Sequence, residues 1–366
     1  MKIAFLNHYI AGGGAERVTC VLAGEMCKRG HNVILITDIF KPFAYTFDNR
    51  VKILPLYKEK KQFNNRILMD FYTIKNTRHI LKTEFPDVLI GVQPQMNFAA
   101  IVASIGLNTK VIATDHTSFD RKLHFNIRFI RNYIYCFADA VTILTQADYN
   151  YLGRRLSNKV IMPNPLCFPC ILNIDTNRKM NILAAGRLGV WYLKGFDLLI
   201  RAWSLIAKDY PEWTLDIAGG GSDKSKEQLY QIAQKYNVEK RINFLGFRED
   251  LDAVMRQSSI FALTSRVEGF GMVLIEAMSQ GCACVSFDDG GRQREIIRND
   301  KEGIIIERHD VSSLANAFRN LIEDENLRYT ISKVSIQRAS DFSIDNIYKK
   351  WDGLIKRVVF GKKYDD

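Results

Sequence analysis

Three glycine-bearing motifs carry the side chains of this sequence that could bind a phosphate or a sugar. The first, Gly12-Gly13-Gly14-Ala15-Glu16-Arg17, directly follows a predicted strand and opens a predicted helix. Glycines let a backbone approach a ligand closely, and a helix N-terminus offers free N–H groups and the positive end of the helix dipole. The spacing matches neither a dinucleotide fingerprint nor a P-loop. The motif indicates anion binding at this turn, with a plain strand-to-helix turn as the alternative.

The second motif places two cations around one loop. Gly186-Arg187-Leu188 follows a strand of the second half, and Lys194-Gly195-Phe196-Asp197 opens the next helix. A guanidinium fork and an ammonium at the carboxyl end of a parallel strand suit a diphosphate. Unrelated surface charges are the alternative.

The third motif carries two carboxylates, Glu268 and Glu276, in the run from Ser265 to Met278. Glu268 is expected in a glycine-bearing turn and Glu276 on the following helix, so the two could hold different hydroxyls of one sugar nucleotide. The apolar neighbours of Glu276 argue against a merely solvated carboxylate, because a buried charge needs a partner.

Parallel sheets covered by helices are the elements that must position these motifs. Short runs rich in Ile and Val alternate with helix-period segments, which is the β-α-β pattern of a parallel sheet. The predicted strands of the first half are 3–7, 33–37, 51–56, 88–92, 111–114, 141–145 and 160–162, and those of the second half are 182–185, 214–218, 242–245, 260–263, 283–287 and 304–307. Helices are predicted in the second half near 195–208, 224–237, 249–256, 272–280 and 311–324.

A length of 366 residues is too large for one ordinary domain. Three of the eight prolines cluster between residues 163 and 169, where neither periodicity continues. We therefore predict a domain at 1–166, a second at 167–340, and a C-terminal helical segment at 341–366 that packs back on the first domain.

Composition favours a globular protein of the cytoplasm. Hydrophobic residues make up 47% and charged residues 25%, which excludes disordered and fibrous classes. No apolar run is long enough to span a bilayer, and the apolar start is too short for a signal peptide. Seven scattered cysteines fit reduced thiols better than a disulfide framework.

Basic charge is concentrated in the first half. The net charge is +11, and residues 1–175 hold 22 Lys and Arg against 13 Asp and Glu, an excess of +9. Such an excess suits nucleic acid, an anionic membrane or a phosphorylated substrate. No zinc-finger spacing or RNA-binding signature appears, so nucleic acid is not an expected partner.

The three motifs in this order and spacing resemble glycosyltransferase family 4, the retaining nucleotide-sugar-dependent enzymes of the GT-B fold. The resemblance covers essentially the whole chain and extends to Met162-Pro163-Asn164-Pro165 and Phe244-Leu245-Gly246-Phe247-Arg248. It implies two Rossmann-like domains with parallel sheets facing a central cleft: an N-terminal acceptor-binding domain and a C-terminal nucleotide-sugar-binding domain.

The resemblance also implies the donor contacts. Arg187 and Lys194 would neutralise the donor diphosphate, Glu276 would bind the ribose hydroxyls, and Glu268 would hold a sugar hydroxyl. His116, after Asp115 at the end of a predicted strand, would lie at the edge of the donor sugar, with a buried structural histidine as the alternative. The remaining positions implied for the donor are the Phe270 and Gly271 amides, Gly13 and Gly14 over the phosphates, and Phe247 and Arg248 beside the base.

One loop departs from the family pattern. Where relatives often have a glycine and a proline before Glu-Ile-Ile, this chain has Asp289-Gly290-Gly291-Arg292-Gln293-Arg294-Glu295-Ile296-Ile297. The role of a loop with two arginines stays open.

The expected chemistry is hexosyl transfer without a metal or other cofactor. No Asp-x-Asp metal site is evident in this family's manner, so Arg187, Lys194 and helix N-termini would stabilise the departing diphosphate. The resemblance implies retention by front-face attack, with His116, Arg187, Lys194 and Glu268 as the catalytic set. A UDP-hexose or UDP-N-acetylhexosamine is the expected donor, although the sequence leaves sugar and base open.

The acceptor prediction rests on a basic stripe. Arg121, His124, Arg128 and Arg131 are spaced 3, 4 and 3, which would place them on one helix face, with Lys122 beside them. Such a stripe suits a polyprenyl-diphosphate-linked glycan and an anionic membrane surface. We therefore predict a peripheral enzyme on the inner face of the cytoplasmic membrane, in lipopolysaccharide or other surface polysaccharide assembly. An ordinary solvated helix face, a soluble acceptor, and a sugar-nucleotide epimerase of the same fold are the alternatives.

Overall fold

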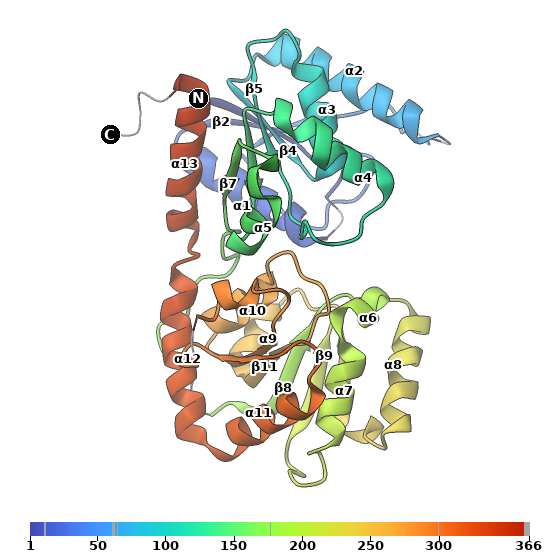
Figure 1. Cartoon of the computed structure of the whole chain (residues 1–366), viewed down its shortest axis with the longest axis vertical. Helices are drawn as coiled ribbons and strands as arrows, with labels where there is room; N and C mark the ends of the chain where they lie inside the picture. Colours follow the sequence, from blue (N-terminus) through green and yellow to red (C-terminus); the bar gives the residue numbers. More distant parts are fainter. Residues whose placement is uncertain (11, 61–62, 64, 176, 299, 362–366) are drawn as a thin grey trace. The chain divides into compact units, whose positions relative to one another are not determined.

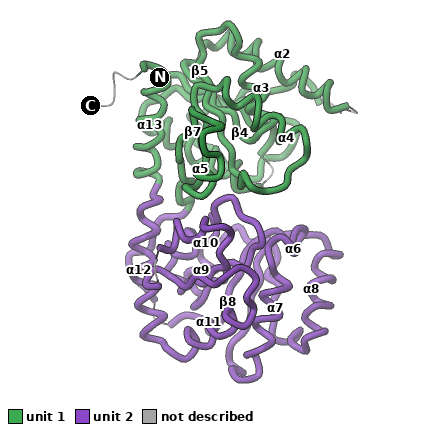
Figure 2. Tube along the Cα trace, in the orientation of Figure 1, with its two compact units in different colours: residues 1–167, 344–366 green, residues 168–343 purple. Residues whose placement is uncertain are grey.

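Parallel strands form two separate sheets in this chain, as the alternation of strand and helix patterns predicts (Figure 1). The computed structural model describes residues 1–10, 12–60, 63, 65–175, 177–298 and 300–361. Two compact units comprise residues 1–167 with 344–366 (unit 1) and residues 168–343 (unit 2) (Figure 2). The observed boundaries, after residues 167 and 343, lie one and three residues beyond those expected after residues 166 and 340. Residues 362–366 of the expected tail lie outside the described residues.

The sheet of unit 1 has seven strands in the order β3-β2-β1-β4-β5-β6-β7. Its strands are apolar on both faces because helices cover both sides of a parallel sheet. The strands are β1 (Lys2–Leu6), β2 (Asn32–Thr37), β3 (Lys52–Pro55), β4 (Val88–Val92), β5 (Lys110–Thr114), β6 (Ala140–Ile143) and β7 (Lys159–Ile161).

The sheet of unit 2 has six strands in the order β10-β9-β8-β11-β12-β13. Strands β8 and β11 are its central pair; β11 is buried throughout and β8 is buried from Asn181 onward. The strands are β8 (Lys179–Ala185), β9 (Thr214–Ala218), β10 (Ile242–Gly246), β11 (Ser258–Leu263), β12 (Ala283–Phe287) and β13 (Ile304–Ile306).

Helices of unit 1 connect its parallel strands, and the last helix of the chain joins them. Helix α13 packs against α1, where its buried side chains Ile347, Trp351 and Leu354 continue the core. His31 Nε2 and Tyr348 Oη form a hydrogen bond of 2.9 Å at this contact. The helices are α1 (Gly14–Lys28), α2 (Arg66–Glu84), α3 (Pro94–Ser104), α4 (Phe125–Phe129), the π-helical turn η1 (Ile130–Ile134), the 3₁₀ turn η2 (Tyr135–Phe137), α5 (Gln146–Leu152), η3 (Gly153–Arg155) and α13 (Ile344–Phe360).

Helices of unit 2 likewise connect the parallel strands of the second sheet. Trp203 of α7 is fully buried against this sheet, and α12 packs beside α10. The helices are α6 (Trp191–Lys194), α7 (Phe196–Ser204), α8 (Asp223–Lys235), α9 (Leu251–Gln257), α10 (Met272–Ser279), α11 (Val311–Glu323) and α12 (Glu325–Ser340), with the 3₁₀ turns η4 (Leu188–Val190), η5 (Glu239–Arg241) and η6 (Gln293–Glu295).

Each sheet has one point where the strand order reverses. It falls between β1 and β4 in unit 1 and between β8 and β11 in unit 2. In open parallel sheets, ligands bind at the carboxyl ends of the strands flanking this point. The first motif follows β1, the second follows β8 and the third follows β11, so all three flank a reversal point.

The predicted helical face of basic residues is wrong. Arg121 and His124 precede α4, and Arg131 lies in the π turn with its side chain buried. The spacing argument assumed one regular helix, whereas the helix begins at Phe125 and changes its pitch after Phe129. Arg121, Lys122 and Arg128 are exposed as expected, but Arg131 cannot contribute to a solvent-facing surface.

Candidate active site

An ion pair at the reversal point of unit 2 joins the second and third motifs. Lys194 Nζ lies 2.6 Å from Glu268 Oε1, and the Ser265 hydroxyl donates to the same oxygen over 2.6 Å. Lys194 ends α6 after β8, while Ser265 and Glu268 lie in the turn after β11. The sequence therefore predicted two members of this cluster from separate motifs. It did not single out Ser265, although a hydroxyl three residues before Glu268 is visible in the motif.

Two glycines allow the loops of this cluster to touch. A Cβ on Gly195 would lie 1.8 Å from the carbonyl oxygen of Thr264, and Gly195 has a φ of +67°. A Cβ on Gly186 would lie 3.2 Å from Cδ of Lys194. The Lys194 side chain thus lies across Gly186, and Gly195 holds the start of α7 against the end of β11.

The loop with two arginines holds the backbone of the Glu268 turn. Asp289, after β12, accepts a hydrogen bond of 2.7 Å from the Glu268 amide through Oδ2, and its other carboxylate oxygen is paired with Arg308. Arg292 is fully buried, and its Nη1 donates to the Asp289 carbonyl over 3.0 Å and lies 3.9 Å from Oδ2. Arg294 differs, since it is exposed and pairs with Asp288 at 2.8 Å. The loop therefore places a buried cation next to the carboxylate that fixes this turn.

The other residues expected at the donor lie around the same edge of the sheet. Arg187 is exposed at the start of the turn after β8, and no other described side chain pairs with it. Phe247, after β10, is exposed beside Gly220, whose Cβ would lie 3.6 Å from that of Phe247. Arg248 pairs with Asp250 at 2.6 Å.

The helix after Glu268 begins at a glycine with a positive φ. Gly271 precedes α10 with a φ of +96°, and a Cβ there would lie 3.2 Å from the Leu263 side chain. The Phe270 ring is buried against Phe342, with centroids 5.5 Å apart, so only its backbone could meet a ligand. Glu276 lies inside α10 and is buried.

In unit 1, the first motif meets the end of β4. Gly13 caps the start of α1 and Gly14 is its first residue. A Cβ on Gly13 would lie 2.2 Å from Glu16 Oε2, so the Glu16 carboxylate lies directly over Gly13. Gln93, with a φ of +73°, donates to Glu16 Oε1 over 3.4 Å. The sequence reasoning did not single out Gln93, which the Gln-Pro pair after a strand could have marked.

His116 is held by a residue of the domain junction. Its Nδ1 lies 3.1 Å from Oδ1 of the buried Asn164. Burial lowers the pKa of His116, and the opposing effects of Asp115 and Asn164 do not reverse this. A neutral imidazole whose Nδ1–H donates to Asn164 leaves Nε2 as an acceptor.

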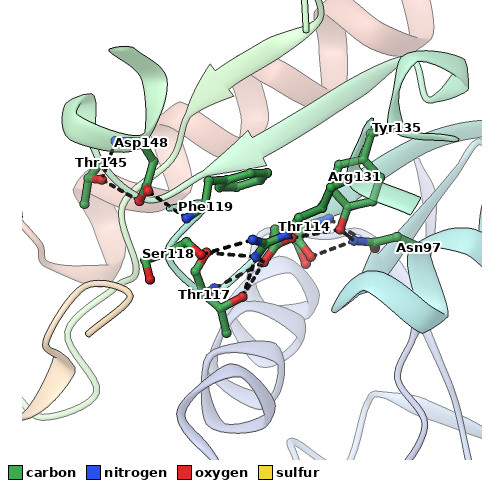
Figure 3. Close-up of polar contacts among 10 residues, drawn as sticks. Asn97, Thr114, Thr117, Ser118, Phe119, Arg131, Tyr135, Thr145 and Asp148 are labelled. Atoms are coloured by element: carbon green, nitrogen blue, oxygen red, sulfur yellow. Dashed lines mark hydrogen bonds and ion pairs between the residues drawn. The ribbon is translucent and has the colours of Figure 1, made fainter. Parts of the chain in front are cut away.

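Asp115, next to His116, is the centre of a buried network with Arg131 and Tyr135, which are labelled in Figure 3. Arg131 binds its carboxylate with two hydrogen bonds of 2.8 Å, and the Tyr135 hydroxyl donates to it over 2.9 Å. Asn97 donates to Tyr135 Oη and to the Thr114 carbonyl, each over 2.9 Å. Burial acts to lower the pKa of Arg131, but Asp115 outweighs it and holds that pKa above its usual value. The network ties η1 and α3 to the end of β5.

Family comparisons match both units. The model "Glycosyl transferases group 1" matches residues 172–338, and the model "Glycosyltransferase Family 4" matches residues 12–165. The chain belongs to glycosyltransferase family 4. It is a glycosyltransferase, and the family and enzyme class expected from the three motifs are confirmed.

Relatives of this glycosyltransferase align along its whole length. One from Campylobacter jejuni, named GalNAc-alpha-(1->4)-GalNAc-alpha-(1->3)-diNAcBac-PP-undecaprenol alpha-1,4-N-acetyl-D-galactosaminyltransferase, is 29% identical over 364 residues, covering 98% of this chain and 99% of the relative. The amylovoran biosynthesis glycosyltransferase AmsD of Erwinia amylovora is 28% identical over 356 residues, covering 94% and 96%.

Solved structures confirm the GT-B fold of this glycosyltransferase. HepE from Anabaena, in complex with UDP and glucose, superposes with a TM-score of 0.81 at 21% identity, covering 97% of this chain and 99% of HepE. A sucrose-phosphate synthase from Thermosynechococcus elongatus gives 0.82 at 19%, covering 99% and 100%. Within the described part of the glycosyltransferase, no helix combines the length and apolar character that crossing a bilayer requires.

Proposed function

We propose that the enzyme transfers a hexose or N-acetylhexosamine from a UDP-sugar to a hydroxyl of a polyprenyl-diphosphate-linked glycan, in the assembly of a surface polysaccharide. The Lys194–Ser265–Glu268 cluster carries the donor part of this proposal, because it places a cation and a hydroxyl-binding carboxylate at one strand edge. The acceptor part is supported by the full-length Campylobacter relative, whose name includes a diphosphate-linked undecaprenol glycan.

The donor diphosphate would lie between Arg187 and Lys194. The exposed guanidinium of Arg187 and the ammonium of Lys194 supply two cations after β8. Glu268 would accept a hydrogen bond from a sugar hydroxyl once the diphosphate binds the Lys194 ammonium. Glu276 would bind the ribose, and Phe247 and Arg248 would border the base.

We propose a retaining, metal-independent reaction. Breaking the anomeric C–O bond leaves negative charge on the diphosphate, and fixed cations near that oxygen stabilise the charge as it develops. The leaving phosphate oxygen can then take the proton of the acceptor hydroxyl as that hydroxyl attacks the same face of the sugar. His116, neutral through burial, would accept a hydrogen bond from a substrate hydroxyl through Nε2.

Nucleotide release from a panel of UDP- and GDP-sugars, with and without a diphosphate-linked glycan acceptor, tests donor and acceptor together. We expect release only with a UDP-hexose or UDP-N-acetylhexosamine, and a product glycan one sugar longer with an α-linkage. Transfer to a soluble sugar phosphate alone would overturn the lipid-linked acceptor. Conversion of the donor without any acceptor product would indicate an epimerase.

Chelation tests the metal-independent step. Activity is expected to persist in excess EDTA, because Arg187 and Lys194 supply the positive charge. Activity that is lost in EDTA and restored by Mg²⁺ or Mn²⁺ would contradict this part of the proposal.

A lipid-linked acceptor implies work at a membrane surface. We propose that the enzyme is a peripheral protein of the inner face of the cytoplasmic membrane. The excess of +9 charges within residues 1–175 supports attraction to anionic lipids.

A further inference from the structure

Four aromatic side chains form an exposed row on unit 1. Phe125, Phe129, Tyr133 and Phe137 follow one another at every fourth residue through α4, η1 and η2, and they are 77%, 45%, 62% and 72% exposed. The rings of Phe129 and Tyr133 lie with their centroids 5.2 Å apart. A π turn holds more residues per turn than an α-helix, so a four-residue spacing drifts less around the axis. We call these four side chains the aromatic row.

The opposite side of the same segment is fixed to the core. Ile130, Arg131 and Tyr135 are buried, and Arg131 and Tyr135 bind Asp115 at the end of β5 (Figure 3). The Arg131 guanidinium also lies 4.1 Å from the Phe119 ring centroid. The segment cannot rotate to bury its aromatic row without breaking these buried contacts. The row is therefore a permanent feature of the surface.

Cations accompany the aromatic row. Arg121, Lys122 and Arg128 are exposed along the same stretch of chain. Asp120 is the single acidic residue in the sequence from 116 to 138. Aromatic rings beside Lys and Arg are the combination found where proteins meet the headgroup region of a bilayer.

We propose that the aromatic row is the surface with which this enzyme binds an anionic lipid bilayer. The rings lie at the boundary of headgroups and acyl chains, and Arg121, Lys122 and Arg128 bind the lipid phosphates. The proposal rests on the proposed function only in that a lipid-linked acceptor gives the enzyme a reason to be at a membrane. A second copy of the chain is a poorer partner, because a symmetric pair would bring the same cations together.

Vesicle flotation of the full chain tests the proposal. The vesicles consist of phosphatidylcholine alone or mixed with an equal amount of phosphatidylglycerol. The wild-type enzyme is expected to float with the anionic vesicles and to bind the neutral ones at least about tenfold more weakly. The double variant Phe129→Ser, Tyr133→Ser should lose at least about tenfold in partition to the anionic vesicles. The triple variant Arg121→Gln, Lys122→Gln, Arg128→Gln should lose the preference for anionic lipid.

A matched control removes two exposed aromatic rings outside the row. The double variant Tyr151→Ser, Tyr329→Ser should float like the wild type, since neither residue belongs to this segment. A separate variant, Phe129→Trp, reports insertion directly: its added emission should be quenched by lipids brominated near the headgroup. Emission unaffected by brominated lipid would overturn the proposal, as would equal flotation of the wild type and the Phe129/Tyr133 variant.

Two further measurements distinguish a failure of the bilayer proposal from a failure of the proposed function. If the wild type is a dimer in solution and Phe129→Ser, Tyr133→Ser is a monomer, a second copy covers the row and the bilayer proposal falls. Transfer to a short-chain, water-soluble diphosphate-linked acceptor should have the same kcat/KM in this double variant and in the wild type. A wild-type enzyme that floats but does not use this acceptor would contradict the proposed function while leaving the membrane surface intact.

Discussion

At the scale of single residues, the Lys194 charge of the proposed donor site is already paired before any ligand binds. Lys194 is paired with Glu268, and Glu268 also accepts from Ser265. Under the proposed assignment, an incoming diphosphate would draw Lys194 toward itself, which would free one oxygen of Glu268 for a sugar hydroxyl. The proposed roles of Lys194 and Glu268 can therefore be measured separately.

Removing the Lys194 ammonium should reduce turnover. We expect Lys194→Ala to lower kcat/KM about ten- to hundredfold, because a charge-assisted contact contributes about 1.5–3 kcal/mol. Steady-state kinetics with the preferred nucleotide sugar measures the change. Arg201→Ala, an exposed cation of α7, serves as the control and should behave like the wild type. An unchanged rate for Lys194→Ala would exclude contact with the diphosphate.

The pH dependence of the reaction should report His116. Because burial lowers its pKa from 6.5, His116 is neutral at pH 7, and kcat/KM should fall only as the pH drops below about 6.5. Asn164→Asp would place a carboxylate beside Nδ1, favour the imidazolium and move this acid limb to higher pH. Asn150→Asp, an exposed change in the same unit, should leave the profile unaltered. A limb that does not move in Asn164→Asp would show that His116 is not the titrating group.

Asp289 should act on sugar binding through Glu268. Asp289→Asn weakens the acceptor of the Glu268 amide and leaves two nearby arginines without their carboxylate. Titration calorimetry should show UDP affinity within about twofold of wild type, whereas the extra affinity of the UDP-sugar over UDP falls about tenfold. Asp288→Asn, whose partner Arg294 is exposed, is the control. Equal losses for UDP and UDP-sugar would indicate general damage to the unit rather than positioning of Glu268.

At the scale of elements, the segment from α4 to η2 depends on one buried ion pair. Arg131 reaches from the π turn to Asp115 at the end of β5, and both side chains are almost without solvent contact. A buried ion pair that loses one partner leaves the other charge uncompensated. The whole segment, including the aromatic row, is therefore held by this pair and by Tyr135.

Replacing Arg131 should destabilise the enzyme. Arg131→Met is expected to lower the free energy of unfolding by about 3–5 kcal/mol, and adding Asp115→Asn should recover part of that loss. Urea unfolding of the full chain followed by circular dichroism measures both. Arg128→Met, three residues earlier and exposed, should stay within about 0.5 kcal/mol of wild type. A double variant no more stable than Arg131→Met would mean that the cost comes from packing instead of charge.

The segment from α4 to η2 also shows a limit of structure prediction from the sequence. Apolar runs placed the strands well, because burial on both faces of a parallel sheet leaves a continuous local pattern. The basic face failed at Arg131, because its burial depends on Asp115, which lies 16 residues earlier in the chain. A local period could not foresee the π turn that re-aims the side chain.

The candidate site was foreseeable only in part for the same reason. Lys194 and Glu268 were found because each lies in a motif with its own spacing. Asp289 and Asn164 appeared within motifs, but their pairing with Glu268 and His116 became visible only when the strand ends were placed side by side. Contacts between loops of different strands follow from the strand order, which the residue pattern does not contain.

At the scale of the whole molecule, the chain passes between its units twice. It leaves unit 1 after Cys167 and returns at Ile344, so α13 supplies part of the core of unit 1. Trp351 of this helix lines a small cavity together with Phe5 and His116. The C-terminal helix therefore forms part of the surroundings of His116, a residue of the proposed site.

Truncating Trp351 should weaken unit 1. Trp351→Ala is expected to cost about 3–5 kcal/mol, since a buried aromatic side chain leaves a cavity. Thermal unfolding should show a lower midpoint than for the wild type, while the exposed neighbour Lys350→Ala should not shift it. An unchanged midpoint for Trp351→Ala would mean that α13 does not contribute to the stability of unit 1.

Because the chain passes from unit 1 to unit 2 and back, the two units can complete their folding in only one order during synthesis. Unit 2 is one uninterrupted stretch of chain, so it can complete its core as soon as residue 343 has left the ribosome. Unit 1 is begun first, but one side of it waits until α13 emerges. A product of late premature termination would therefore combine a finished unit 2 with a unit 1 whose apolar face is open, the kind of surface that chaperones and proteases recognise.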